Sequence, residues 1–205
     1  MAVIKSGATS DQLTVDPTSK AARVTLYDPE GNVLSRKVST YSAALGNTNT
    51  AAGTGVFLSI QGSSTKTIRV HKVLVTGTVA TAAVYGSVVC NKRLTGATSG
   101  GTATTITPIA HDSVSASPSA VVKYYTALAT AGTGGGTIAA QSDFFPITAT
   151  VGAEPANLLF LPQQDTGAET QDWVLRGTNE CLEFAFSATT TNAPTLTVWV
   201  TFTEE

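Results

Sequence analysis

The residues of this chain whose chemistry could serve catalysis or metal binding are few, and their spacing indicates no reaction. His111, Asp112 and Ser113 are the residue types of a hydrolytic triad, but a triad is assembled from distant positions, and consecutive residues do not ordinarily adopt its geometry. We therefore interpret them as part of a polar loop. The other histidine, His71, lies on an expected strand beside Arg69. Two histidines and two cysteines without short ligand spacing do not predict a zinc site.

Acidic pairs give an equally weak signal. Glu180 with Glu183, or Asp143 with Asp165, could serve as the two carboxylates of a glycosidase. Any chain with 14 acidic residues contains such pairs, so their presence does not favour sugar hydrolysis. We therefore assign no catalytic, cofactor-binding or metal-binding residues, and we expect a protein that is not an enzyme and needs no cofactor.

Four aromatic residues allow a different kind of site. Trp173, Trp199, Tyr124 and Tyr125 could stack on sugars if they shared one face of a sheet. We favour the alternative, in which these side chains pack in the core and at subunit interfaces, because that is the more common position of large aromatic residues.

The composition restricts the class of partner. Of 205 residues, 42% are hydrophobic and only 13% are charged, which is about half the charged share usual for soluble domains. The net charge is -2, so no basic surface is expected to bind a nucleic acid backbone. No run approaches the roughly 18 apolar residues of a membrane span, and the first residues lack the pattern of a signal peptide. A surface with so little charge favours association, so we expect a homo-oligomer.

The elements that position these residues are expected to be β-strands, and the clearest of them is residues 195–203. Leu196, Val198, Val200 and Phe202 fall on one face of this strand, because successive side chains of a strand point to opposite sides. The other face consists of threonines interrupted by Trp199. We therefore expect a loop or a neighbouring subunit to cover the polar face near its middle.

Further strands are expected throughout the second part of the chain. In residues 67–76 the hydrophobic face changes side midway, as it does at a β-bulge or where a strand passes from one environment to another. Residues 120–126 allow a helix or a strand, and Val121, Val122 and the two tyrosines favour the strand. With strands also expected at 56–60, 82–94, 102–107, 137–144, 157–161, 173–176 and 181–187, the fold class is all-β, a β-sandwich or jelly-roll-like domain.

The two cysteines lie on two of these expected strands. Cys90 and Cys181 could form a disulfide, but each belongs to an apolar run in which a small buried thiol is the more common state. A domain of this length also needs no cross-link to fold. We therefore favour two buried thiols and leave the pairing open.

The chain before this domain is expected to be organised differently. Residues 1–38 are interpreted as an extended arm and a β-hairpin, with strands at 22–27 and 33–38 around a turn at 28–32 that contains proline and glycine. Residues 39–55 are rich in small side chains and predict a linker, so the sandwich would comprise 56–205. An isolated hairpin is marginally stable, so we expect residues 1–38 to attach to a partner.

Four stretches resemble one known family. Residues 7–28, Gly-Ala-Thr-Ser-Asp-Gln-Leu-Thr-Val-Asp-Pro-Thr-Ser-Lys-Ala-Ala-Arg-Val-Thr-Leu-Tyr-Asp, resemble the amino-terminal segment of structural proteins of tailed bacteriophages. Residues 107–113, 173–178 and 199–205 resemble later parts of the same proteins, so the resemblance covers most of the chain. It implies a virion protein assembled in the host cytoplasm, and such proteins have no catalytic residues to transfer.

The resemblance leaves two functions open. One is a capsid decoration or cement protein that binds and stabilises the head shell. Its expected partners are the major capsid protein and its own copies, as a homotrimer or another small oligomer. The other is a tail or fibre module that recognises a host surface glycan through exposed aromatic side chains. Copy number separates the two, because a decoration protein is present in many more copies per particle than a tail protein.

Overall fold

The computed structural model describes residues 14–15, 22–23, 38–146, 154–162, 172–190 and 192–205. The chain divides into two compact units, Met1–Lys37 and Val38–Glu205. In the first unit, the two-residue strands β1 (Thr14–Val15) and β2 (Ala22–Arg23) pair antiparallel. The hairpin expected from strands 22–27 and 33–38 lies almost entirely outside the described residues.

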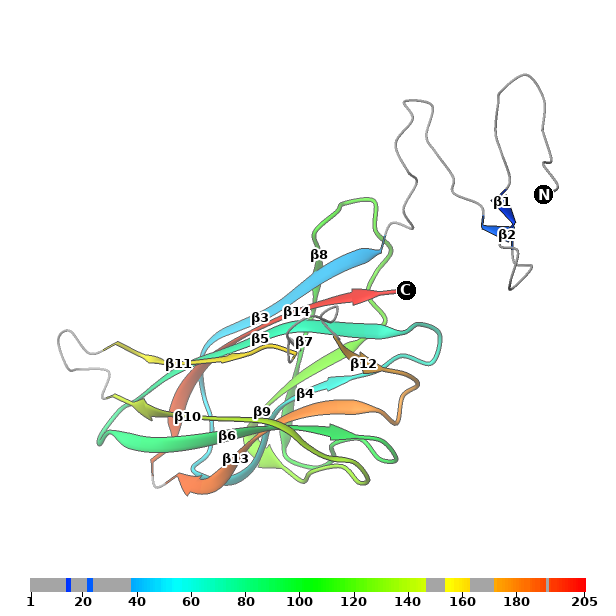
Figure 1. Cartoon of the computed structure of the whole chain (residues 1–205). Helices are drawn as coiled ribbons and strands as arrows, with labels where there is room; N and C mark the ends of the chain where they lie inside the picture. Colours follow the sequence, from blue (N-terminus) through cyan, green and yellow to red (C-terminus); the bar gives the residue numbers. More distant parts are fainter. Residues whose placement is uncertain (1–13, 16–21, 24–37, 147–153, 163–171, 191) are drawn as a thin grey trace. The chain divides into compact units, whose positions relative to one another are not determined.

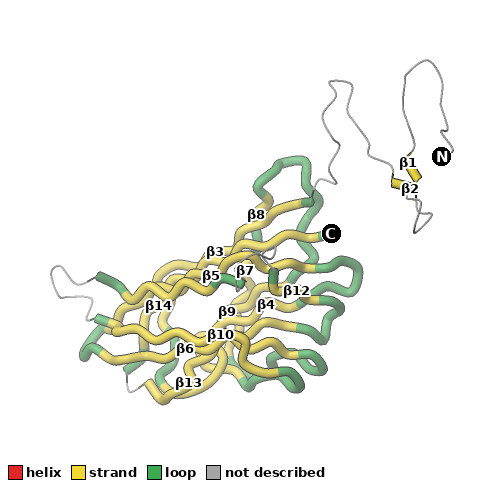
Figure 2. Tube along the Cα trace, viewed as in Figure 1, coloured by secondary structure: helices red, strands yellow, loops and turns green. Residues whose placement is uncertain are grey.

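The second unit is an all-β sandwich of two antiparallel sheets, as the strand pattern predicted (Figures 1 and 2). We name each sheet after one of its central strands. The β4 sheet has the order β10 (Gly136–Phe145), β6 (Val84–Arg93), β13 (Cys181–Thr190), β4 (Gly53–Gln61), β9 (Val121–Ala129) and β7 (Thr102–Ile106). The β14 sheet has the order β11 (Ala156–Phe160), β5 (Ile68–Val79), β14 (Pro194–Glu204), β3 (Ser39–Asn49) and β8 (Ile109–Ala110), and β12 (Trp173–Leu175) also pairs with β5.

The central strand of the β14 sheet is the one that the sequence predicted most clearly. Its four expected core residues, Leu196, Val198, Val200 and Phe202, are all 0% exposed. The ring of Phe202 stacks on Tyr41 of β3 with 5.4 Å between ring centroids. The faces of β14 are therefore assigned correctly by its alternation.

The expected linker at residues 39–55 is wrong, because these residues form strands of the sandwich. β3 lies between β14 and β8, and it pairs with β14 along most of its length. Tyr41 and Ala43 point inward and are fully buried. The small side chains of β3 show little hydrophobic pattern. The segment nevertheless forms a strand, because β14 supplies its hydrogen-bonding partner. A domain starting at residue 56 would lack this strand.

The β-bulge expected within residues 67–76 is confirmed in β5. Val70 pairs with Phe202 and Lys72 pairs with Thr201, so one extra residue, His71, is inserted between the two pairs. Val70 and Val73 are fully buried on either side of the bulge. The bulge therefore places both His71 and Lys72 on the outer side of the sheet, where the candidate site described below is located.

The cysteines lie on neighbouring strands of the β4 sheet, and both are free and buried. Burial raises the pKa of the Cys90 thiol, and the negative charge of Glu183 raises it further. Burial also raises the pKa of Cys181 and raises that of Tyr124 to about 12, although the hydrogen bond of Tyr124 with Thr50 opposes this shift.

The described part of the chain contains no helix long and apolar enough to cross a membrane.

These shifts predict a loss of stability in alkali. Cys90 and Tyr124 hold their protons more tightly in the folded chain than in the unfolded one, whose pKa values are about 8.5 and about 10. Their contribution to folding is complete below those values and decreases as the pH rises towards the folded values. Urea unfolding should therefore show a falling midpoint above about pH 8.5. Cys90→Ala should flatten the first part of that decrease, and an unchanged slope would contradict the assignment.

Candidate functional site

The outer face of the β14 sheet carries a row of apolar side chains in its middle. Leu159 of β11 pairs with Leu74 of β5, Leu74 pairs with Trp199 of β14, and Trp199 pairs with Ala44 of β3. Trp199 is 51% exposed and Leu159 is 38% exposed, so this apolar row is open to solvent. The described residues contain no loop that covers Trp199 as the sequence led us to expect, and a neighbouring subunit is the other expected cover.

A polar cluster borders this row and orients the indole ring of Trp199. The Nε1–H group of Trp199 donates a hydrogen bond to Oγ of Ser42 at 3.3 Å. The same oxygen lies 2.7 Å from Nε2 of His111 and 3.4 Å from Oγ1 of Thr201. Ser42 therefore links β3, β14 and the loop after β8, and it holds the ring at the surface with polar groups beside it.

The loop interpretation of residues 111–113 agrees with this geometry. Oδ1 of Asp112 accepts a hydrogen bond from the backbone N–H of Val114 at 3.0 Å, which stabilises the turn. His111 instead contacts Ser42, so the hydroxyl it meets is not that of Ser113.

A second histidine cluster lies on the same face and was missed by sequence reasoning. Nδ1 of His71 is 2.7 Å from Oδ1 of Asp172, and its Nε2 is 3.0 Å from Oγ1 of Thr203. These residues are far apart in the chain, and only the sheet brings them together. The chain of contacts resembles a catalytic relay, but acyl transfer also needs donors placed for the developing oxyanion. We interpret these three residues as a structural contact that holds the start of β12 on the outer face.

The aromatic residues proposed as a sugar platform do not share a face. Tyr124 is 0% exposed and Tyr125 is 2% exposed, and both belong to β9 of the other sheet. Trp173 packs against Phe184 with 6.5 Å between ring centroids. The core interpretation is therefore correct for the two tyrosines, and Trp199 is the member of this group that the outer face exposes.

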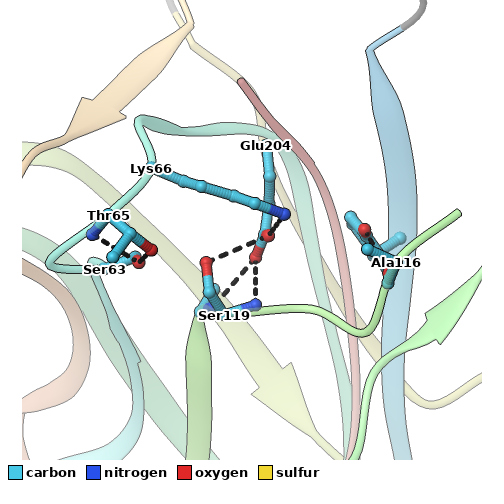
Figure 3. Close-up of polar contacts among 8 residues, drawn as sticks. Ser63, Thr65, Lys66, Ala116, Ser119 and Glu204 are labelled. Carbon is cyan, nitrogen blue, oxygen red and sulfur yellow. Dashed lines mark hydrogen bonds and ion pairs between the residues drawn. The ribbon is translucent and has the colours of Figure 1, made fainter.

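Glu204 is a buried carboxylate that sequence reasoning did not single out (Figure 3). Its side chain is fully enclosed and forms an ion pair with Nζ of Lys66 at 3.0 Å. It also accepts hydrogen bonds from the backbone N–H groups of Ser119 and Ala120, both at 2.8 Å, and from the hydroxyl of Ser119. Glu204 thus fastens the segment before β9 to the end of β14, which is a structural role.

Glu183 has a similar role in the β4 sheet. Its fully buried carboxylate accepts hydrogen bonds from Nε of Arg93 at 2.7 Å, from the Thr98 hydroxyl at 2.7 Å and from the Gly132 N–H at 2.5 Å. Glu180 binds Lys92 at the surface instead, so the two glutamates occupy different environments.

The other acidic pair cannot be compared in this way. Asp143 accepts a hydrogen bond from the backbone N–H of Asn157, and Asp165 lies outside the described residues. Within the described ranges, no group of three or more His, Cys, Asp and Glu residues could hold a metal ion.

No family model matches the chain, and neither the curated proteins nor the solved structures contain a match to it. The arrangement of the described residues is therefore the basis for a functional argument. The surface feature that these residues form is the outer face of the β14 sheet, with the apolar row and the Ser42 cluster beside it. An exposed, uncharged row with an oriented indole ring is suited to contact with another macromolecule.

Proposed function

We propose that this chain is a non-enzymatic structural protein of a phage virion, a capsid decoration or cement protein that contacts a neighbouring protein through the outer face of the β14 sheet. The apolar row is the observation that supports this proposal. Trp199, Leu159 and Leu74 form a continuous apolar strip, and exposed strips of this kind mark interaction surfaces. The resemblance to virion proteins supplies the assembly to which that neighbour belongs.

The low charge of the chain favours association over a monomeric state. A net charge of -2 with 13% charged residues gives weak repulsion between copies. Covering the indole of Trp199 removes apolar surface from water, and its N–H group already has a partner in Ser42. A contact on this face therefore gains the hydrophobic free energy without leaving a buried donor unpaired. The neighbour is the major capsid protein or another copy of the chain.

The N-terminal unit is proposed to attach the sandwich to the shell. Met1–Lys37 forms a unit separate from Val38–Glu205, which is the arrangement expected of an attachment segment and a displayed domain. The boundary has moved from the expected residue 56 to residue 38, because β3 belongs to the sandwich. A deletion that tests attachment must therefore end at residue 37.

The proposal predicts that Trp199→Ser abolishes contact without unfolding the protein. Trp199 is half exposed, so its loss should change the unfolding midpoint little. Binding to purified shells, measured as copies per particle on quantitative gels, should fall about tenfold or more, as it does when an aromatic anchor is removed from an interface. Leu94→Ser is the matched control, because Leu94 is 46% exposed on a loop away from this face.

Three results decide the proposal. Wild-type binding by the Trp199→Ser variant would refute the outer face as the contact surface. Retained binding after deletion of residues 1–37 would refute the attachment segment alone. Failure of the wild-type chain to bind any shell would refute the decoration function.

A tail or fibre module that binds a host glycan is the second candidate, and one observation favours it. The exposed indole of Trp199 lies beside the Ser42 hydroxyl and the His111 imidazole, so an apolar ring face and hydrogen-bonding groups occur together. Such a combination suits the apolar and hydroxyl surfaces of a sugar. Location on the particle separates the candidates, since a decoration protein covers the head and a glycan-binding module occupies the tail.

A further inference from the structure

The two edges of the sandwich differ in how their outermost strands are protected from pairing with another chain. At one edge, β10 and β11 end the two sheets, and side chains of β10 bond to the backbone of β11. Nε2 of Gln141 donates to the carbonyl oxygen of Leu159 at 2.5 Å, and Oδ2 of Asp143 accepts from the N–H of Asn157 at 2.9 Å. The ladder of β10 is also interrupted by a bulge between Thr137 and Ala139. These are devices that prevent an edge strand from pairing with another chain.

At the opposite edge, no side chain of the other sheet among the described residues bonds to the backbone of β7, although the β7–β9 ladder also shifts register between Thr102 and Ala103. This strand ends the β4 sheet, and among the described strands it pairs with β9 alone. Its first four residues, Thr102 to Thr105, are exposed, while Ile106 anchors it in the core. No charged residue occurs between Thr95 and Ala110, although charges are the usual means of keeping an edge strand unpaired. Threonine also has a high preference for strands.

Two exposed apolar side chains lie on β8 and in the turn that follows it. β8 follows β7 after two residues and ends the β14 sheet. Ile109 of β8 is 73% exposed and Val114 in the following turn is 80% exposed, the highest values among the large hydrophobic residues that the structure describes. Ile109 pairs with Ser42 of β3, so it extends the outer face of the β14 sheet, and the open edge of β7 is by itself suited to a protein that adds a strand there.

We propose that the occupant of this edge is a second copy of the chain, whose β7 pairs antiparallel with β7 across a two-fold axis near Thr104. Self-pairing fits these residues because an isologous contact places each side chain opposite a residue of the same strand. Thr104 faces its own copy and Thr102 faces Ile106, so uncharged side chains meet without repulsion. The β4 sheets of the two copies become one continuous sheet.

This inference goes beyond the proposed function and is independent of the virion role. It also uses a surface separate from the apolar row, because β7 belongs to the other sheet. A two-fold contact at β7 leaves the outer face of the β14 sheet free for a further neighbour.

Disulfide trapping tests the register directly. Opposite residues of an antiparallel pair have Cα atoms about 4.5–5.5 Å apart, which is within the range that a disulfide spans. The full-length Thr104→Cys variant should therefore form a cross-linked dimer under mild oxidation. Ser142→Cys is the matched control on the protected edge, since Ser142 is also exposed on an edge strand. The wild-type chain should not cross-link, because Cys90 and Cys181 are buried.

A second experiment places a charge at the two-fold axis and measures the dissociation of the dimer. Thr104→Lys places two lysines opposite each other, so the dissociation constant of the dimer, measured by light scattering, should rise about tenfold or more. Ser142→Lys should leave the dimer unchanged, and both variants should keep the wild-type circular dichroism spectrum because the sites are exposed. Equal cross-linking of the two cysteine variants, or a wild-type monomer at every accessible concentration, would overturn the inference. A chain that carries both Thr104→Cys and Trp199→Ser and still cross-links would show that the two surfaces act separately.

Discussion

Replacing Phe202 with alanine is expected to lower the free energy of unfolding by about 3–5 kcal/mol. Phe202 is 0% exposed and stacks on Tyr41 in the core of the sandwich. Truncation removes the burial of the ring and leaves a cavity that the two packed sheets close only in part. Denaturant unfolding measures this loss, which is a large fraction of the stability of a typical domain.

Thr201→Ala is the control for this prediction, because Thr201 precedes Phe202 and points to the outer face. Its Oγ1 atom lies 3.4 Å from Oγ of Ser42, so one weak hydrogen bond is lost. The expected cost is below about 1 kcal/mol. Equal losses at the two positions would mean that a neighbouring chain buries the outer face as deeply as the core.

Replacing Glu204 with alanine is expected to lower the free energy of unfolding by a comparable amount, about 3–5 kcal/mol, because the change breaks a buried ion pair and its hydrogen bonds. The variant leaves the N–H groups of Ser119 and Ala120 without their acceptor, and it leaves Lys66 without its ion-pair partner. Each buried donor that loses its partner costs about 1–3 kcal/mol. Denaturant unfolding measures the total, and amide exchange at Ser119 and Ala120 should become faster because their hydrogen bonds are gone.

Glu205→Ala is a matched control from the next position. Glu205 forms its ion pair with Arg69 at the surface, where both side chains are partly exposed. Such pairs contribute about 0–1 kcal/mol, so this variant should be close to wild type in stability. If Glu204→Ala proved as mild as Glu205→Ala, water would have replaced the missing carboxylate, and the segment before β9 would not depend on it.

Pairing in the sheet decides whether a segment with little pattern becomes a strand. Residues 39–49 contain small polar side chains and were expected to be a linker. They form β3 because β14 offers backbone partners along most of the segment and space for Tyr41 and Ala43. Composition reflects the average preference of a segment, whereas a strand is stabilised by neighbours that are distant in sequence.

The functional clusters were beyond sequence reasoning for the same reason. Asp172 is 101 residues from His71, and Thr203 is 132 residues from it, so no spacing signals their contact. The partners of Glu204 at Ser119 and Ala120 are 85 and 84 residues away. A motif search detects chemistry within a short stretch, and these groups meet only after the sheets have formed.

What the sequence determined by itself is local and periodic. The side-chain alternation of β14 and the change of face in β5 predicted which residues are buried, because the two-residue period of a strand is encoded in neighbouring positions. What only the tertiary structure decided is which strands are neighbours. Strand order placed Leu159, Leu74 and Trp199 in one exposed row and left β7 at an open edge, because cross-strand contacts depend on pairing and register between distant segments.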